Sequence, residues 1–385
     1  MHMDQERIRC AFLRGGTSRG AYLLEKDLPR DPQLRDQVIL AIYGSPDPRQ
    51  IDGLGGADSL TSKVAIIAPS DRPDADVDYT FGQVSITARL VDYKGNCGNI
   101  SSGVGPFAID EGLVKPVEPI TQVRIYNTNT HKTIVAEVPV KDGKALVEGD
   151  CAIDGVPGTG ARIMLDFVDS GGAVTGKLLP TGRVKDTIEV EGRRYTVSLV
   201  DAANPGIFVK AEELGLRGTE LAGEIDANPW LLQELESIRS IGAEMIGLVQ
   251  DRRDGTRLSP AVPKVAFVSP PQEYRSSKGE VVHPEAIDLT ARIMSMQKAH
   301  KAYAVTGGIA TATAARIPGT LVNELFQPRE GTDFVRIGHS SGVLALEIVV
   351  EPRGEGLFLK RAALERTARR IMDGYVYLPK SKMTL

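Results

Sequence analysis

The sequence predicts an α+β protein with two pseudo-symmetric domains, each a curled antiparallel sheet around a central helix. Three observations predict this fold class: a set of motifs that occurs twice in the same order, an excess of β-rich segments over helical ones, and many turn-forming residues. The 385 residues exceed one ordinary hydrophobic core, so two domains are expected. The 40 glycines and 23 prolines indicate many turns and hence many strands.

Four segments of the first half recur in the second half with the same order and similar spacing. The match is loose residue by residue, so chance similarity between common strand patterns is the alternative interpretation. A duplication predicts domains at 1–183 and 184–385, and the C-terminal tail could pack back on the first domain. The paired segments are 10–23 with 197–209, 62–67 with 263–268, 97–105 with 306–314 and 123–130 with 335–342.

The local patterns predict which segments form strands and which form helices. Asn228 followed by Pro229 is typical of a helix start, because asparagine caps the first turn and proline fits the first helical position. The third repeated segment consists of small residues, which suits a helix inside a curled sheet. The expected strand segments are 79–91, 122–138, 161–168, 187–200, 264–269 and 343–350, and the expected helical segments are 33–43, 229–249, 285–299 and 360–372.

Composition and missing motifs argue against several classes of function. The net charge is −4 and no basic stripe alternates with aromatic residues, so we expect no nucleic-acid partner. Residues 1–9 are polar and no apolar run approaches the roughly 20 residues that span a bilayer, so we expect neither a signal peptide nor a membrane. Three scattered cysteines then predict reduced thiols and a cytoplasmic protein. No metal-ligand spacing, P-loop or dinucleotide-binding glycine motif is present, so we expect no metal.

Cys97 is the first candidate for chemistry. It directly precedes an expected helix that opens with Gly98, Asn99, Ser101 and Ser102. The first turn of a helix carries free N–H groups and a partial positive charge, which bind carboxylates and favour a thiolate. Cys97 could therefore act as an acid or base beside a bound anion, or it could be a buried thiol that only fills space.

The second half offers a matching helix start at Gly307 and Gly308. Two helix N-termini that face one crevice between the halves would hold two carboxylates of one substrate. We therefore expect the ligand site in such a crevice.

Lys63 is the second candidate. It follows a glycine-rich loop that contains Asp58 and Ser62, and it opens an apolar strand. A lysine held against apolar surface can lose its proton and act as a base. The alternative is an ordinary surface lysine at a strand edge.

Polar turns complete the set of candidates. Arg14, Gly15, Thr17 and Ser18 join two strands, and an arginine among small hydroxyl residues suits a carboxylate clamp. The turns around Asn127 and His339 occupy matching places of the two halves. Each of these turns could instead be a hydrogen-bonded turn without a ligand. The residues that we expect to contact a substrate are Arg14, Gly15, Thr17, Ser18, Asp58, Ser62, Gly98, Asn99, Ser101, Ser102, Asn127, Asn129, Gly307, Gly308, His339, Ser340 and Ser341.

Four stretches of the sequence resemble the methylaconitate isomerase family: 13–20 (LRGGTSRG), 44–53 (GSPDPRQIDG), 55–63 (GGADSLTSK) and 96–99 (NCGN). The family includes 2-methylaconitate, 3-methylitaconate and 4-oxalomesaconate isomerases, and it shares the diaminopimelate epimerase fold. The resemblance covers nearly the whole chain. The loop before Lys63 is most similar to that of the 4-oxalomesaconate tautomerases.

The resemblance implies a cofactor-independent proton transfer at a site between two domains, without a metal. Diaminopimelate epimerases use one cysteine from each half, and Cys97 matches the first of them. Thr306 lies where the second cysteine would be, which argues against a two-thiol epimerase. In the isomerase family a lysine at the position of Lys63 joins the cysteine, so Lys63 and Cys97 are implied as the catalytic pair.

The expected partner is a small polycarboxylate, with 4-oxalomesaconate as the first substrate and 2-methylaconitate or 3-methylitaconate as the alternative. A non-catalytic polycarboxylate-binding protein is the alternative of another class. A homodimer is compatible with all of these interpretations.

Overall fold

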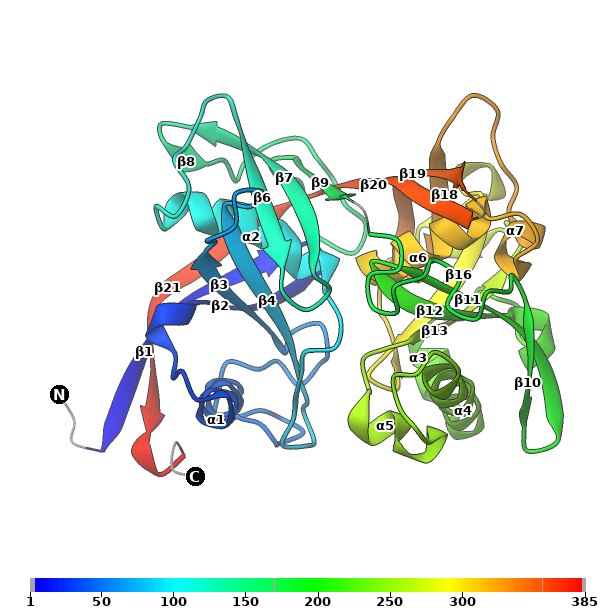
Figure 1. The fold of residues 1–385 in the computed structure, drawn as a ribbon, viewed down its shortest axis with the longest axis horizontal. Coiled ribbons are helices and arrows are strands. Elements are labelled where there is room, and N and C mark those ends of the chain that lie inside the picture. Colours follow the sequence, from blue (N-terminus) through cyan, green and yellow to red (C-terminus); the bar gives the residue numbers. More distant parts are fainter. Residues whose placement is uncertain (1–3, 169, 355, 383–385) are drawn as a thin grey trace. The chain divides into compact units, whose positions relative to one another are not determined.

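The computed structural model describes residues 4–168, 170–354 and 356–382 (Figure 1). The chain divides into two compact units, Met1–Leu165 with Glu365–Leu385, and Asp166–Leu364. This division differs from the boundary expected at 183/184. Gly171, which precedes the expected boundary, already forms a β-bridge with Ala202 of the second unit. Residues 365–385 belong to the first unit, where the last strand lies beside the first (Figure 1).

The first unit is a mixed sheet with strand order β21-β1-β2-β3-β4-β6-β7. Two of its pairings, β2–β3 and β4–β6, are parallel, and the others are antiparallel. Its elements are β1 (Gln5–Gly15), β2 (Ser18–Leu24), η1 (Glu25–Asp27), α1 (Pro32–Tyr43), β3 (Lys63–Pro69), β4 (Val77–Val84), β5 (Val91–Asp92), α2 (Gly98–Asp110), β6 (Ile120–Asn127), β7 (Lys132–Lys141), β8 (Lys144–Ala145), β21 (Ala368–Pro379) and η5 (Lys380–Lys382). Strand β9 (Ile163–Val168) contains the point at which the chain leaves this unit.

The second unit repeats this plan with strand order β10-β11-β12-β13-β16-β18-β19-β20. The parallel pairings are again the third and fifth in the strand order, β12–β13 and β16–β18. Its strands are β10 (Asp186–Val190), β11 (Arg193–Ala202), β12 (Asn204–Lys210), β13 (Lys264–Ser269), β14 (Tyr274–Arg275), β15 (Val281–Val282), β16 (Leu289–Ser295), β17 (Lys298–Ala299), β18 (Phe334–His339), β19 (Gly342–Arg353) and β20 (Gly356–Arg366). Its helices are η2 (Ala211–Leu214), α3 (Ala222–Asp226), α4 (Pro229–Met245), η3 (Arg252–Asp254), α5 (Gly255–Leu258), η4 (Pro284–Ala286), α6 (Val305–Arg316) and α7 (Leu321–Leu325).

The strand register confirms the duplication. Gly20 pairs with Lys63 across β2 and β3, and Gly206 pairs with Lys264 across β12 and β13. A carboxylate contact is repeated as well: in the first unit an Asp76 oxygen accepts from the backbone N–H of Arg124 at 2.8 Å. The carboxylate of Asp288 makes the same contact with Arg336 in the second unit, also at 2.8 Å. The predicted fold class is therefore confirmed, with parallel pairs added to the antiparallel ones.

Each unit encloses one helix made of small residues. Residues 98–109 of α2 and 305–315 of α6 are all buried. Helix α2 packs against eight strands of its own unit, so little room is left beside it. A Cβ atom added at Gly103 would lie 2.4 Å from the hydroxyl of Tyr22. Small residues are therefore required where the helix touches the surrounding sheet.

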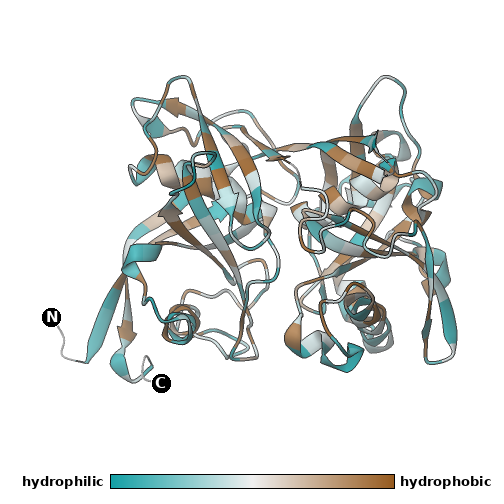
Figure 2. Ribbon diagram, viewed as in Figure 1, coloured by the Kyte–Doolittle hydropathy of each residue, from teal (hydrophilic) through white to brown (hydrophobic). Residues whose placement is uncertain are grey.

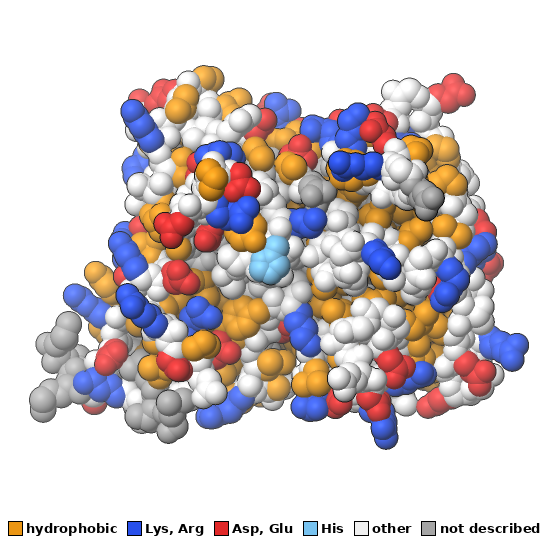
Figure 3. Space-filling view, viewed as in Figure 1, with side chains coloured by type: hydrophobic (Ala, Val, Ile, Leu, Met, Phe, Trp, Pro, Cys, Tyr) orange, Lys and Arg blue, Asp and Glu red, His pale blue; other side chains and the backbone are white. Residues whose placement is uncertain are grey.

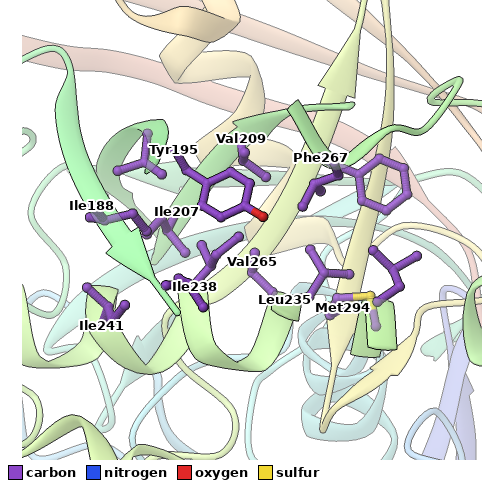
Figure 4. Close-up of a cluster of buried hydrophobic side chains, with 14 of the residues drawn as sticks. Ile188, Tyr195, Ile207, Val209, Leu235, Ile238, Ile241, Val265, Phe267 and Met294 are labelled. Atoms are coloured by element: carbon purple, nitrogen blue, oxygen red, sulfur yellow. The ribbon is translucent and has the colours of Figure 1, made fainter. Parts of the chain in front are cut away.

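A longer helix covers the outer face of each sheet. Helix α1 starts at Asp31, whose carboxylate accepts from the N–H of Leu34, and it ends at Gly44 with φ +67°. Helix α4 starts at Asn228 with Pro229 in its first turn, as the sequence predicts. The aliphatic side chains of α4 pack on β10 to β13 (Figure 4), and brown in Figure 2 marks the hydrophobic residues of these elements.

The prediction of a helix is wrong for two segments. Segment 285–299 forms β16 and β17, and segment 360–372 forms most of β20 and the start of β21. All seven residues of β16 are buried, so the strand lacks the alternation that distinguishes a strand from a helix in sequence. The other two expected helices are confirmed as α1 and α4.

Among the residues that the structure describes, no helix is long and apolar enough to cross a membrane. Over the same residues, no group of three or more His, Cys, Asp or Glu side chains is arranged to hold a metal ion. On the face drawn in Figure 3, positive and negative side chains are interspersed.

Candidate active site

Lys63 is the first residue of β3 and lies between two neighbouring strands. Its partners in the sheet are Gly20 on β2 and Gln83 on β4. The residue is 5% exposed. Its Nζ atom donates to Oε1 of Gln83 at 2.8 Å and lies 5.5 Å from the centre of the Phe81 ring. Lys63 is therefore a buried amine beside an aromatic ring, and the surface-lysine interpretation does not fit.

The backbone of Lys63 is also held by a hydrogen bond. Its carbonyl oxygen accepts a hydrogen bond from the buried hydroxyl of Tyr43, which in turn accepts from the N–H of Ala21 at 2.8 Å. No ion pair with Lys63 is present among the residues that the structure describes. The amine is therefore positioned by neutral groups.

Gln83 is a contact that the sequence analysis missed. Its Nε2 atom donates to the carbonyl oxygens of Ser59 at 3.1 Å and Ser62 at 3.0 Å. The side chain is 3% exposed. Lys63 and Gln83 are 20 residues apart, and only their pairing across β3 and β4 brings them together.

The loop before Lys63 is shaped by two of the predicted residues. Asp58 accepts from the N–H of Leu60 at 2.8 Å, and the hydroxyl of Ser62 donates to Gln50 at 2.8 Å. The same Gln50 oxygen accepts from the N–H of Ala57 at 2.8 Å. In this structure Asp58 and Ser62 fix the path of the chain into β3.

Cys97 occupies the position that caps the first turn of α2. It has φ −118° and ψ 100°, its side chain makes no capping hydrogen bond, and it is 9% exposed. The N–H of Cys97 donates to Asn96 Oδ1 at 2.6 Å, and its carbonyl accepts from the hydroxyl of Ser101 at 3.0 Å. The backbone of Cys97 is thus fixed by hydrogen bonds. Its thiol forms no disulfide, and neither do the thiols of Cys10 and Cys151.

Two buried tyrosines lie in the surroundings of Cys97. Burial, followed by the neighbouring Cys97 thiol, raises the pKa of Tyr22 on β2 and of Tyr79 on β4. The Tyr22 hydroxyl donates to the carbonyl of Ile100 in the first turn of α2 at 2.5 Å. Both phenols are therefore neutral groups near the helix start.

The predicted Arg14–Ser18 loop packs on the first turn of α2. The N–H of Thr17 donates to Asn99 Oδ1 at 3.2 Å. A Cβ atom at Gly15 would lie 2.4 Å from the Asn99 carbonyl, so this loop needs glycine to come close to the helix. The structure therefore brings Gly15, Thr17 and Asn99 together.

Arg14 connects this loop to Thr367, the residue between β20 and β21. Its Nη1 atom donates to the carbonyls of Gly16 and Thr367, both at 3.0 Å. Burial, followed by the neighbouring Arg369, lowers the pKa of the Arg14 guanidinium. Ser18 and Ser102 are buried, and the Ser102 hydroxyl donates to the Asn99 carbonyl at 2.6 Å.

The side chains of Asn127 and Asn129 form hydrogen bonds with other residues of the first unit. Asn129 donates to the carbonyls of Phe81 at 2.8 Å and Tyr93 at 2.7 Å, and its oxygen accepts from the N–H of Phe81 at 2.7 Å. The Asn127 oxygen accepts from the N–H and hydroxyl of Thr130 at 2.9 and 2.7 Å. These contacts correspond to the hydrogen-bonded turn that the sequence left as an alternative.

In the second unit the matching turn is also internally bonded. His339 Nδ1 accepts from the N–H of Ser341 at 3.1 Å, and the Ser341 hydroxyl donates to the carbonyl of Lys301. Ser340 is buried, and its carbonyl accepts from the N–H of Ser277 at 2.7 Å. These three residues lie in one turn between β18 and β19.

Gly307 and Gly308 make room for aliphatic side chains in the second unit. Added Cβ atoms would lie 2.2 Å from Ile293 and 2.6 Å from Leu344, so both glycines serve close packing of α6. His300 is buried in the segment before α6, and its Nδ1 accepts from the N–H of Ala302 at 3.1 Å. His300 is a buried titratable group that the sequence analysis did not consider.

Lys63 and Cys97 both belong to the first unit, and α2 packs against β3. Lys63 begins the strand and Cys97 precedes the helix, so one unit carries the implied acid–base pair. The expected crevice between the two halves stays a prediction.

Comparison with known proteins gives the family. The sequence profile described as "PrpF protein" matches residues 5–379, nearly the whole chain. The chain belongs to the PrpF family. It is 54% identical over 381 residues to the 3-methylitaconate isomerase of Eubacterium barkeri, with 99% of each chain covered.

Other named relatives of this PrpF protein are also isomerases. The 4-oxalomesaconate tautomerase of Pseudomonas putida is 43% identical over 377 residues, with 97% of each chain covered. The 2-methyl-aconitate isomerase of Shewanella oneidensis is 41% identical over 391 residues, with 98% of each chain covered. The chain is therefore an isomerase, and the predicted family is confirmed.

Solved structures agree with the fold. A methylitaconate-delta-isomerase crystal structure matches with a TM-score of 0.80 and 54% identity, over 99% of this chain and 98% of the other. A hydroxyproline epimerase from Agrobacterium vitis matches with a TM-score of 0.57 and 12% identity, over 98% and 93% of the two chains. The second likeness concerns the fold alone.

Proposed function

We propose that this isomerase moves a proton and a double bond within an unsaturated dicarboxylate of the methylitaconate type, with Lys63 and Cys97 as the acid–base pair. The observation that carries the proposal is the buried Lys63 amine, held by the neutral Gln83 amide, in a chain 54% identical to a 3-methylitaconate isomerase. The comparisons favour this substrate over 4-oxalomesaconate, because the tautomerase relative is 43% identical.

The proposed reaction is a 1,3-allylic shift. The C–H bond breaks at the carbon that lies between a carboxylate and the double bond, and its electron pair spreads over a dienolate. The proton then forms a new C–H bond at the far carbon of the former double bond. For methylitaconate, the terminal methylene becomes a methyl group and the double bond moves between the two carboxylate-bearing carbons. Atoms and electrons balance without a redox partner.

Lys63 as the base and Cys97 as the acid fit this chemistry. A buried lysine that has no ion pair can accept a proton, and a thiol can return one. The first turn of α2 offers N–H groups and a partial positive charge, which stabilise a carboxylate and the charge of the dienolate. The two roles can also be exchanged between the residues.

The test is proton NMR in D2O with 3-methylitaconate, 2-methylaconitate and 4-oxalomesaconate as separate substrates. We expect deuterium entry and a shifted double bond, fastest with 3-methylitaconate. Lys63→Ala and Cys97→Ser should each lower the rate at least about 100-fold, as for loss of an acid–base group. Lys141→Ala, at the exposed end of β7, is the matched control and should react like the wild type.

Each contrary result has a defined meaning. Full activity of Lys63→Ala would refute the assigned pair. Faster turnover of 4-oxalomesaconate would reverse the substrate preference. Binding of all three acids without deuterium entry would refute turnover of this substrate class and support a binding role.

A further inference from the structure

We propose that Gln83 is a positioning residue that holds the Lys63 amine in both of its charge states, which rests on the proposed catalytic role of Lys63. The two side chains meet across β3 and β4 with 2.8 Å between Lys63 Nζ and Gln83 Oε1. Gln83 was not among the residues that the sequence singled out. Its contribution would be to the orientation of the amine and not to proton transfer itself.

The orientation of the Gln83 amide is fixed by its other contacts. The carbonyl oxygens of Ser59 and Ser62 can only accept hydrogen bonds, so the NH2 end of the amide must face them. The oxygen end then faces Lys63. The loop 59–62 and β4 therefore present one acceptor at one place to the amine.

The neutrality of this acceptor matters for a base. A carboxylate at the same distance would favour the ammonium form, because opposite charges attract strongly at a buried site. An amide oxygen accepts a hydrogen bond from either –NH3⁺ or –NH2. Lys63 can thus give up and regain a proton without losing its position.

Other titratable groups lie on the elements packed around Lys63. They include Arg19 and Tyr22 of β2, Arg35, Asp36 and Tyr43 of α1, Asp58 of the loop, Asp78 and Tyr79 of β4, Asp92 of β5, and Cys97 and Asp110 at the two ends of α2. Among the residues described, none of them forms an ion pair with Lys63. Gln83 is the side chain that receives a hydrogen bond from Nζ.

The duplicated half provides an internal comparison. Lys264 is the counterpart of Lys63, because each lysine pairs with a glycine of the preceding strand. Lys264 Nζ donates to the backbone carbonyl of Ala261 at 3.2 Å, whereas Lys63 Nζ donates to the side-chain amide of Gln83. The acceptor on Gln83 thus distinguishes the half that carries the proposed catalytic lysine, which favours a role in the chemistry of Lys63.

The test compares Gln83→Glu and Gln83→Met with the wild type, using pH–rate profiles on the acid that turns over fastest. In Gln83→Glu the rising limb of kcat should move to higher pH by at least about one unit, so activity near neutral pH falls about 10-fold and recovers in alkali. In Gln83→Met, kcat should fall at least about 10-fold with KM changed less than about threefold. Gln33→Glu, exposed in the first turn of α1, is the control for added charge and should leave the profile in place.

Several results would overturn the proposal. One is a folded Gln83→Glu protein with an unmoved profile, and another is Gln83→Met with wild-type kcat. A loss of activity that follows a lower unfolding midpoint and a raised KM would mean a structural role only. If Gln83→Glu does not fold, Gln83→Met alone decides the outcome through the comparison of kcat with KM.

The activity of Lys63→Ala distinguishes failure of the positioning role from failure of the proposed function. An inactive Lys63→Ala with an unmoved Gln83→Glu profile refutes only the positioning role. An active Lys63→Ala, or no turnover of any acid in the set, refutes both proposals.

Discussion

Replacement of Gly20 by alanine should damage the sheet and the candidate active site together. An added Cβ atom at Gly20 would lie 1.7 Å from the carbonyl oxygen of Lys63. Contacts of this kind are not found below 3.0 Å, so β2 and β3 would have to separate by roughly 1.3 Å. Because the obstacle is main chain and not a flexible side chain, no rotamer change can relieve it.

The expected loss can be estimated from two contributions. Overpacking costs about 1–3 kcal/mol, and weakening of the hydrogen bonds to the Lys63 carbonyl costs about 1 kcal/mol more. Gly20→Ala should therefore lower the free energy of unfolding by about 3 kcal/mol, measured by urea titration followed by circular dichroism. Isomerase activity should fall as well, since the displaced residue is Lys63.

Two glycines provide matched controls. An added Cβ atom at Gly206, the counterpart of Gly20, would meet the ring of Phe208 at 2.7 Å, and a side chain can move, so the loss should be about 1–2 kcal/mol. Gly223 lies in α3 with no atom within 4 Å of an added Cβ, so Gly223→Ala should be neutral or stabilise by up to about 1 kcal/mol. If Gly20→Ala unfolded at the same urea concentration as Gly223→Ala, the argument from close approach would be refuted.

Two further predictions concern buried groups of the first unit. Tyr43→Phe leaves the N–H of Ala21 and the carbonyl of Lys63 without their shared hydroxyl, so the free energy of unfolding should fall by about 2–4 kcal/mol; a urea titration that shows a change below about 0.5 kcal/mol would contradict this. Burial raises the pKa of the Cys10 thiol from 9.0 to about 12, so the neutral thiol contributes stability that is fully present below pH 9 and is lost as the pH rises towards 12. Between pH 8 and pH 10 the wild type should therefore lose about 1.4 kcal/mol more stability than Cys10→Ala, and parallel stability curves for the two proteins would disprove the raised pKa.

The duplication could be predicted from the sequence because its short motifs recur in the same order in both halves. The segments around Lys63 and Lys264 became β3 and β13, and each lysine pairs with a glycine of the preceding hairpin. Comparison of the two repeats would also have corrected the helix that was wrongly expected at 285–299. Asp76 and Asp288 precede matching strands, so β16 is the counterpart of β4.

The candidate site was only partly readable. Lys63 and Cys97 stand in recognisable motifs, and the structure buries both. Gln83 lies outside those motifs, and its hydrogen bond to Lys63 depends on strand register. Asn129 was expected to face a ligand, but its described hydrogen bonds go to Phe81, Tyr93 and Asn127.

The sequence by itself determined the repeat, the central helices of small residues and the family, and it singled out Lys63 and Cys97 as the candidate acid–base pair. These features depend on local composition and on the order of motifs along the chain. Only the tertiary structure decided that β16 and β20 are strands, which chain segments join each unit, and that Gln83 receives the Lys63 amine. Strand β16 is buried on both faces, which removes the alternation that identifies a strand, and a contact between distant residues exists only after the strands have paired.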